Sequence, residues 1–367
     1  MRQPKTAPDH DVYLKTKYFP ALDGLRALSV FLVFAMHFGG EIAGSRVGWL
    51  GVYVFFVLSG YLITTLLLRE WDATGFVSLK AFYIRRSTRL LPAYFLVYLM
   101  MMVVSYFQSD TAWAEMKAAT PYFLTFMNEF AASSPFGLTW SLGVEWKYYM
   151  VWPLLLVMFG RTSGARFAVA MVCLGVALVI MLGQLHPVWL TPWGYFGLIL
   201  GSLTALLLHS RAGYERLRCL TGNKAAFFLA FVLFVWYRRA DWIESRIGMP
   251  LMVAVFCTLV ALLMPALIAN NTYVARVMGW RPLVFIGQRS YAMYLLQVIA
   301  ALVVIFVLPG TTVGPLLLFG SFAVALVAAH VLYQWFERPI ARWGHGWAEA
   351  VKEGAGDTQP APGAKLG

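Results

Sequence analysis

Charged residues are scarce in this sequence. Only 13% of its 367 residues are Asp, Glu, Lys or Arg, whereas 60% are hydrophobic. A soluble domain carries roughly a quarter charged residues, so this chain has too few charges to cover a water-exposed surface of its size. With a mean hydropathy of +0.69, the composition predicts an integral membrane protein.

Cysteine is also rare. Cys173, Cys219 and Cys257 are far apart and show no CxxC spacing. This pattern excludes a disulfide framework and a zinc site, and it favours small core residues. The chain also lacks a glycine-rich phosphate loop, a GxSxG elbow and an internal repeat. We therefore expect no metal.

Acidic residues are fewer than basic ones, with 17 Asp and Glu against 29 Lys and Arg, which gives a formal net charge of +12. The basic residues occur in short clusters between apolar runs rather than in one continuous patch. Such clusters are typical of topogenic charge in membrane proteins and do not indicate nucleic-acid binding. The expected surroundings are a lipid bilayer.

The ends of the chain lack apolar runs. Residues 1–18 are polar and do not form a cleavable signal peptide, so we expect a cytoplasmic N-terminal tail. Residues 19–343 form the predicted membrane domain. Residues 344–367 are rich in Ala, Gly and Pro, which predicts a disordered cytoplasmic tail with no appended soluble domain.

Long apolar runs between these tails predict an all-α fold of about ten transmembrane helices. A further segment, 120–130, is apolar enough to dip into the membrane without crossing it. The expected spans are 22–40, 49–68, 90–107, 141–159, 167–184, 190–209, 225–237, 249–269, 284–307 and 315–336.

Successive loops between these spans are in turn rich and poor in Lys and Arg. One side of the membrane receives 23 of them and the other side 6. By the positive-inside rule, this predicts an even number of crossings with both termini in the cytoplasm.

Ionisable residues inside predicted spans are costly and indicate function. Arg26 and His37 are eleven residues apart in the first span, which places them on one helix face with a rise of about 16 Å. The pair could line a pocket that an anion enters from the cytoplasm. Alternatively, Arg26 is a snorkelling topogenic charge and His37 is a packing histidine.

A basic cluster, Arg85, Arg86 and Arg89, precedes the third span. Arg86 and Arg89 have the i,i+3 spacing that places two guanidinium groups side by side, as a phosphate site requires. The alternative is a positive-inside anchor. No phosphate-binding role follows from the spacing alone.

Polar residues also interrupt two other apolar spans. Glu145 lies among aromatic residues and could orient His37, bind a hydroxylated acceptor, or pair with Lys147. Ser59 and Tyr61 flank Gly60, where the glycine permits close packing and the hydroxyls supply hydrogen bonds. For these two hydroxyls, packing alone is the favoured interpretation.

Six segments, taken in this order, resemble the membrane-bound acyltransferase-3 family. They are FPALDGLRALSVFLVFAMH, FFVLSGYLI, RRSTRLLPAY, TWSLGVEWKYY, FIGQRSYAMYLL and WFERPIAR, spread over residues 18–342. The family includes O-acetyltransferases of surface polysaccharides, Nod factors and macrolide sugars. The resemblance implies ten core helices in a bacterial inner membrane and a cytoplasm-facing cavity for acyl-CoA, with acetyl-CoA the expected donor. It also implies a glycan or glycolipid acceptor presented from the outer side.

The resemblance also implies residue roles. His37 matches the catalytic histidine, Arg26 its motif partner, and Glu145 the acidic residue of the WSL motif, whereas Arg86 and Arg89, with Arg85 beside them, match the donor-phosphate site. The oxyanion donors remain open, with Ser59, Tyr61 and Trp140 as candidates. Relatives often carry His where this chain has Gln297, which cannot titrate. An acid/base role at that position is therefore in doubt.

The chemistry of acyl transfer agrees with this resemblance. It needs a base for the acceptor hydroxyl, for which a neutral histidine with a pKa of about 6.5 is suited, and a cationic site for the donor phosphates. A transporter or a flippase of a lipid-linked sugar is the main alternative, and an internal repeat would favour it.

Overall fold

The computed structural model describes residues 9–41, 45–131, 133–183 and 190–356. Throughout these residues, helices are connected by short turns, and no strand occurs among them. The longer helices are α2 (Pro20–Phe38), α3 (Leu50–Thr74), α4 (Leu79–Gln108), α5 (Asp110–Leu124), α6 (Trp140–Phe159), α7 (Ser163–Leu182), α8 (Leu190–His209), α10 (Asn223–Arg238), α12 (Met249–Ile268), α15 (Ser290–Val307), α16 (Pro315–Leu332) and α17 (Arg338–Gly356). Short helices connect them: α1 (His10–Lys15), η1 (Ser45–Val47), η2 (Asn128–Ala131), η3 (Gly137–Thr139), α9 (Arg211–Leu217), η4 (Arg218–Thr221), α11 (Ala240–Ile247), α13 (Tyr273–Met278), α14 (Arg281–Gly287) and the π-helical η5 (Tyr333–Glu337).

The predicted all-α membrane fold is confirmed. By length and composition, eight helices in the described part of the chain could cross a membrane, and the bent pair around α10 could make a ninth. Helix α6 has 20 residues but contains Glu145 and Lys147. Eight of the ten predicted spans coincide with a single helix, whereas 284–307 begins in α14 and continues in α15, and 315–336 comprises α16 and most of η5. The predicted dip at 120–130 corresponds to the end of α5, a turn and the start of η2.

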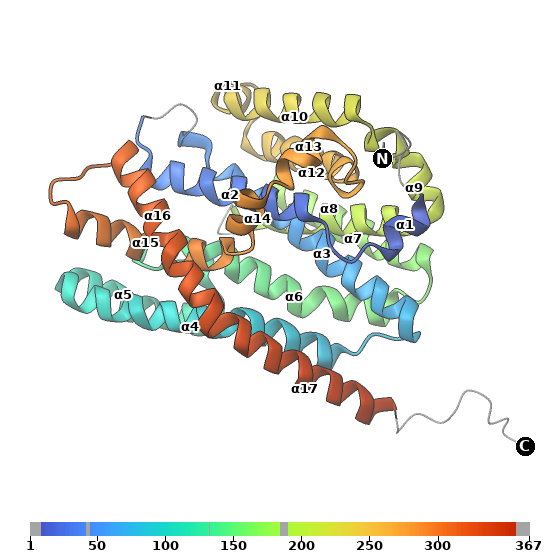
Figure 1. The fold of residues 1–367 in the computed structure, drawn as a ribbon, viewed down its shortest axis with the longest axis horizontal. Coiled ribbons are helices and arrows are strands. Elements are labelled where there is room, and N and C mark those ends of the chain that lie inside the picture. The colour runs from blue at the N-terminus through green and yellow to red at the C-terminus, as the bar shows by residue number, and fades with distance from the viewer. Residues whose placement is uncertain (1–8, 42–44, 132, 184–189, 357–367) are drawn as a thin grey trace, which may run out of the picture.

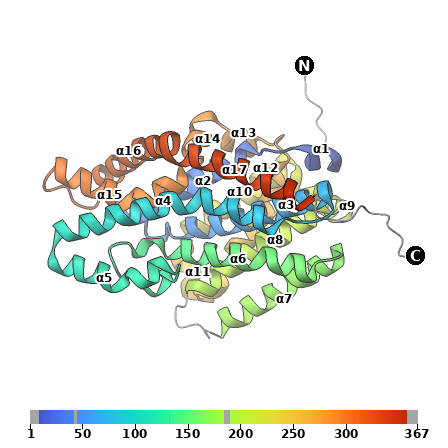
Figure 2. The same ribbon diagram turned by 90° about the horizontal axis from the view of Figure 1, so that it is seen from below.

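The long helices run roughly along the longest axis of the molecule (Figure 1). We call the end that carries α1 and α9 the terminal end, and the end that carries the α4–α5 and α15–α16 connections the far end. A quarter turn shows the same arrangement from below (Figure 2). In the interior, α3 packs against α8 and α2, while α15 packs against α16.

Glycines allow the central helices to touch backbone to backbone. A Cβ added at Gly60 would lie 1.8 Å from the carbonyl oxygen of Leu198, and one at Gly201 would lie 2.0 Å from that of Val57. A side chain at either position would therefore force α3 and α8 apart. Packing thus accounts for Gly60, as the sequence indicated, and it fixes the α3 face that carries Ser59.

The predicted disorder of residues 344–367 is wrong for 344–356, which belong to α17; residues 357–367 lie outside the described part. Helix α17 packs along α4, as both ribbon views show (Figures 1 and 2). Gly344 contacts Thr88, and Ala348 is fully buried. The small residues that suggested disorder are those that let α17 lie directly against α4.

Candidate functional site

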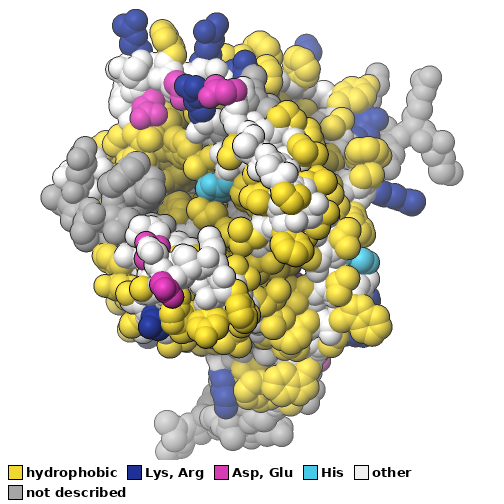
Figure 3. Space-filling view, turned by 90° about the vertical axis from the view of Figure 1, so that its left-hand side faces the viewer, with side chains coloured by type: hydrophobic (Ala, Val, Ile, Leu, Met, Phe, Trp, Pro, Cys, Tyr) yellow, Lys and Arg dark blue, Asp and Glu magenta, His cyan; other side chains and the backbone are white. Residues whose placement is uncertain are grey.

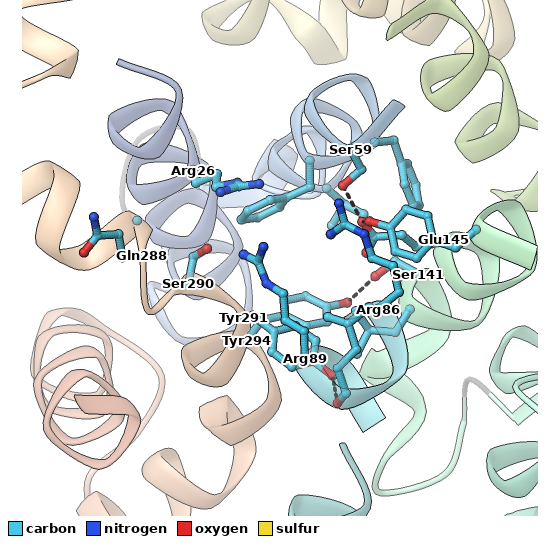
Figure 4. Close-up of a pocket in the computed structure, with 17 residues that line it drawn as sticks. Arg26, Ser59, Arg86, Arg89, Ser141, Glu145, Gln288, Ser290, Tyr291 and Tyr294 are labelled. Atoms are coloured by element: carbon cyan, nitrogen blue, oxygen red, sulfur yellow. Dashed lines mark hydrogen bonds between the residues drawn. The ribbon is translucent and has the colours of Figure 1, made fainter. Parts of the chain in front are cut away.

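Two adjacent cavities lie among the polar residues of the membrane domain. An inner chamber of about 100 Å³ is enclosed by α2, α3, α4, α6 and the start of α15 (Figure 4). A larger vestibule of about 440 Å³ adds residues 17–19, η5 and α17. The cavities share five lining residues, so they meet at one place: Arg26, Arg86, Arg89, Gln288 and Tyr291.

The three shared arginines come from two helices. Arg26 donates to the carboxylate of Asp23, one turn earlier on α2, with an N–O distance of 3.0 Å. Arg86 and Arg89 lie one turn apart on α4, as their spacing predicted, and Arg86 lies 5.5 Å from the centre of the Tyr149 ring. Figure 4 shows the three guanidinium groups around one space.

The Asp23 carboxylate has a second donor. The Tyr18 hydroxyl donates to it over 2.6 Å. Burial and this neighbouring carboxylate raise the pKa of Tyr18 to about 12, so the phenol stays neutral and keeps donating at physiological pH. Asp23 is thereby fixed, and it holds Arg26 at the junction of the two cavities.

The prediction that Arg85 joins this cluster is wrong. Its guanidinium group pairs with Glu70 of α3 at 3.0 Å, and Lys352 of α17 contacts the same carboxylate. Arg85 lines neither cavity. Adjacent helical residues point about 100° apart, so Arg85 and Arg86 face different neighbours.

Glu145 is bound by hydroxyls rather than by a cation. Ser59 and Tyr149 both donate to its carboxylate, and all three side chains line the inner chamber. Lys147, which the sequence offered as an alternative partner, pairs instead with Glu129 of η2. Glu145 therefore faces the chamber together with Arg86.

The inner chamber contains a second hydroxyl pair that sequence reasoning missed. The Ser141 and Tyr294 hydroxyls lie 2.8 Å apart, and Tyr291 lines the same space. Two sequence signals could have found Tyr149, Tyr291 and Tyr294. Tyr149 follows Glu145 by four positions, and Tyr291 and Tyr294 have i,i+3 spacing, so each pair shares a helix face.

His37 lies apart from both cavities. It occupies the last turn of α2, about 16 Å along the helix from Arg26, and lines neither cavity. Val30 and Val33 lie between them on the same face, with 0% and 1% of their surfaces exposed. Arg26 and His37 therefore share one face of α2, as predicted, but the packed side chains of Val30 and Val33 separate them along the helix.

The far end of the bundle, toward which α2 runs, is hollowed. Figure 3 shows a depression on this face with a histidine side chain at its floor and hydrophobic side chains around it. The vestibule is lined instead by residues 17–19, before α2, and by the start of α17.

The remaining candidates lie outside both cavities. The Tyr61 hydroxyl lies 3.2 Å from that of Tyr13 and is fully buried, and Trp140 packs edge-on against Phe56. Gln297 is 1% exposed, and its amide has no hydrogen-bond partner among the described residues. None of the three predicted residues lines either cavity.

Comparison with known proteins agrees with the resemblance in the six segments. The model of a family described as "Acyltransferase domain" matches residues 19–334. Peptidoglycan O-acetyltransferase OatA of Listeria monocytogenes is 29% identical over 76% of this chain and 49% of its own length. The putative peptidoglycan O-acetyltransferase YrhL of Bacillus subtilis is 30% identical over 77% of this chain and 49% of its own length.

A putative O-acetyltransferase of Staphylococcus aureus is 28% identical over 90% of this chain and 59% of its own length. The chain thus spans about half to three-fifths of these curated relatives. No solved structure matches it. Because the family model covers most of the chain, including Arg26, Arg86, Arg89 and His37, the chain belongs to the membrane-bound acyltransferase-3 family.

Proposed function

We propose that this protein is a membrane O-acyltransferase that moves an acyl group, acetyl in the first instance, from cytoplasmic acyl-CoA to a hydroxyl of a glycan or glycolipid. The observation that carries the proposal is the cationic junction of Arg26, Arg86 and Arg89 between the two cavities. Family membership supports the reaction class. The names of the relatives support a glycan acceptor.

The 23-to-6 distribution of Lys and Arg supports a cytoplasmic location for the terminal end, and it assigns Lys17, Arg338 and Arg342 of the vestibule to the same side. Arginine forks bind phosphate oxygens in two-point contacts. Among the described residues, neither Arg86 nor Arg89 has a carboxylate within ion-pair distance. Both are therefore available for the donor's pyrophosphate.

The length of the donor accounts for the distance to His37. From the pyrophosphate, the pantetheine arm reaches about as far as an extended peptide of five residues, roughly 16–18 Å. Arg26 and His37 are separated by a similar rise of about 16 Å along α2. A donor anchored at the arginines could bring its thioester to His37 once Val30 and Val33 move aside.

In this mechanism, neutral His37 takes the proton from the acceptor hydroxyl as the oxygen attacks the thioester carbonyl. The new C–O bond forms, the C–S bond breaks, and the proton passes from the imidazolium to the departing CoA thiolate. Glu145, with the hydroxyls of Ser59 and Tyr149, positions the arm in the inner chamber. The position of His37 in the last turn of α2, toward the far end, supports an acceptor that arrives from the outer surface.

The test uses purified protein in nanodiscs with radiolabelled acetyl-CoA and a muropeptide or lipid-linked glycan acceptor. We expect time-dependent release of free CoA and label in the glycan. His37→Ala should abolish both, whereas Met36→Ala, a neighbour on the same turn that is 36% exposed, should retain them. Unchanged turnover in His37→Ala would reject the histidine as base. Glycan passage without CoA release would favour a transporter.

A further inference from the structure

The vestibule carries a second group of cations, which the acyl-transfer chemistry does not use. Lys17, Arg338 and Arg342 line the vestibule but not the inner chamber. We call them the outer cations. The outer cations are exposed, as is Arg89, whereas Arg26 and Arg86 are partly buried. The cavity therefore has two separate positions for negative charge, one at its inner end and one at its mouth.

Helix α17 presents most of the outer group. Arg338, Ala341, Arg342 and His345 have i, i+3, i+4 and i+7 spacing, so one stripe of the helix lines the vestibule. The adjacent stripe holds α17 against α4 through Gly344 and the fully buried Ala348. The outer cations are therefore fixed relative to the arginines of α4.

These cations lack acidic partners. Arg338 donates to the Gln334 amide oxygen at 3.3 Å. Within the described ranges, no carboxylate lies within ion-pair distance of Lys17, Arg338 or Arg342. Unpaired guanidinium groups at the mouth of a cavity are a site for a phosphate.

A carboxylate in the same wall needs a donor. Glu337, in the π-helical turn η5, lines the vestibule, and its Oε1 atom is buried with no hydrogen-bond partner among the described residues. π-helical turns within longer helices often mark functional sites. The rings of Tyr333 and Phe19 line the same cavity. An amine on an aromatic base would satisfy Glu337 and contact these rings.

We propose that the vestibule binds the nucleotide end of the donor and recognises its ribose 3′-phosphate through Arg338 and Arg342, with Lys17 beside them. Glu337 accepts a hydrogen bond from the exocyclic amine of the adenine. This assignment rests on the proposed function, because it deepens the same donor site. The protein thereby distinguishes CoA carriers from those that lack the 3′-phosphate.

The net positive charge of the vestibule is similar in size to the negative charge of CoA. Six side chains in the vestibule are cationic at neutral pH and two are carboxylates, which leaves four positive charges in excess. A phosphate monoester carries about −1.5 to −2 at pH 7, so with two charges on the pyrophosphate, CoA carries close to −4. The inner arginines alone would leave the monoester without a partner.

The experiment compares acetyl-CoA with 3′-dephospho-acetyl-CoA, both as substrates and, for the thiol forms, by calorimetric binding to protein in nanodiscs. Loss of charge-assisted hydrogen bonds to one phosphate predicts ~10- to 100-fold weaker binding of the dephospho form to the wild type. In the double variant Arg338→Gln/Arg342→Gln, the affinity for CoA should fall to the affinity for dephospho-CoA. The affinity for dephospho-CoA itself should differ little between the variant and the wild type. Lys80→Gln, an exposed residue of α4 outside both cavities, is the matched control and should preserve discrimination.

The possible results distinguish failure of the 3′-phosphate assignment from failure of the proposed acyl-CoA donor. Equal affinity of the wild type for both carriers would overturn the 3′-phosphate assignment while leaving acyl-CoA as the donor. Equal weakening of both carriers in the double variant would also overturn it, since the arginines would then act only by general attraction. Neither binding nor turnover of any CoA would reject the proposed donor together with the subsite. The wild-type comparison decides the question even if the double variant does not fold.

Discussion

Lys147 and Glu145 are two residues apart, yet the structure predicts opposite consequences for their substitution. The Glu129 side chain that pairs with Lys147 is only 3% exposed, and that of Lys147 is 23% exposed. Lys147→Met would leave the Glu129 carboxylate buried without its cation. Breaking a buried pair in this way typically costs 3–5 kcal/mol. Because Lys147 is about a quarter exposed, we expect roughly 3 kcal/mol.

A double-mutant cycle tests the same buried pair. Glu129→Gln in the Lys147→Met background removes the uncompensated charge, so most of the lost stability should return. A loss of 3 kcal/mol corresponds to a fall of on the order of 5 °C in the Tm of a chain of this size. Glu145→Gln should behave differently, with near-normal Tm and strongly reduced acyl transfer, because Glu145 faces the inner chamber.

The assay is thermal unfolding in one detergent, followed by tryptophan fluorescence and by loss of the monodisperse chromatographic peak, with turnover measured on the same samples. A Tm of Lys147→Met within 1 °C of the wild type would refute the buried pair. Strict additivity of the two substitutions would do the same. Conversely, destabilisation by Glu145→Gln as large as that by Lys147→Met would indicate that Glu145 is structural.

Two further predictions follow from the α4 helix. Arg86→Ala and Arg89→Ala should each raise the KM for acetyl-CoA by about tenfold or more, with added salt weakening wild-type binding in the same direction, whereas Arg85→Ala should leave KM unchanged; equal effects at all three positions would contradict the separation of Arg85. Cysteines introduced at Ser78 and Ser109 of a cysteine-free background should differ on intact cells, where only position 109 should react with an impermeant thiol reagent; labelling at position 78 alone would reverse the orientation.

Apolar run length and local spacing were sufficient to predict much of this protein. The run lengths predict the helices because only an apolar run of about 20 residues spans a bilayer. Spacing likewise predicts that Arg86 and Arg89 share a face. Spacing also argues against the Glu145–Lys147 pair, because residues i and i+2 lie on nearly opposite sides of a helix. Tyr149, at i+4, was the better choice.

Contacts between distant segments could not be read in the same way. Glu129 is 18 residues from Lys147, and Glu70 is 15 residues from Arg85. No local rule names either partner, because each depends on how helices pack. The Ala- and Gly-rich composition of residues 344–356 has two outcomes, disorder in water or close contact with a neighbouring helix, and only the presence of α4 decides between them.

The Val30–Val33 contact on α2 has an electrical consequence. The function proposed above passes an acyl group across a bilayer, and such a protein must not conduct ions, since each elementary charge that crosses dissipates about 2.3 kcal/mol per 100 mV of membrane potential. Val30 and Val33, 0% and 1% exposed, lie on α2 between Arg26 of the vestibule and His37. In the proposed function, these two side chains would keep ions from crossing whenever no donor arm is present. Smaller residues there would cost the cell part of its proton gradient even if every acyl transfer proceeded normally.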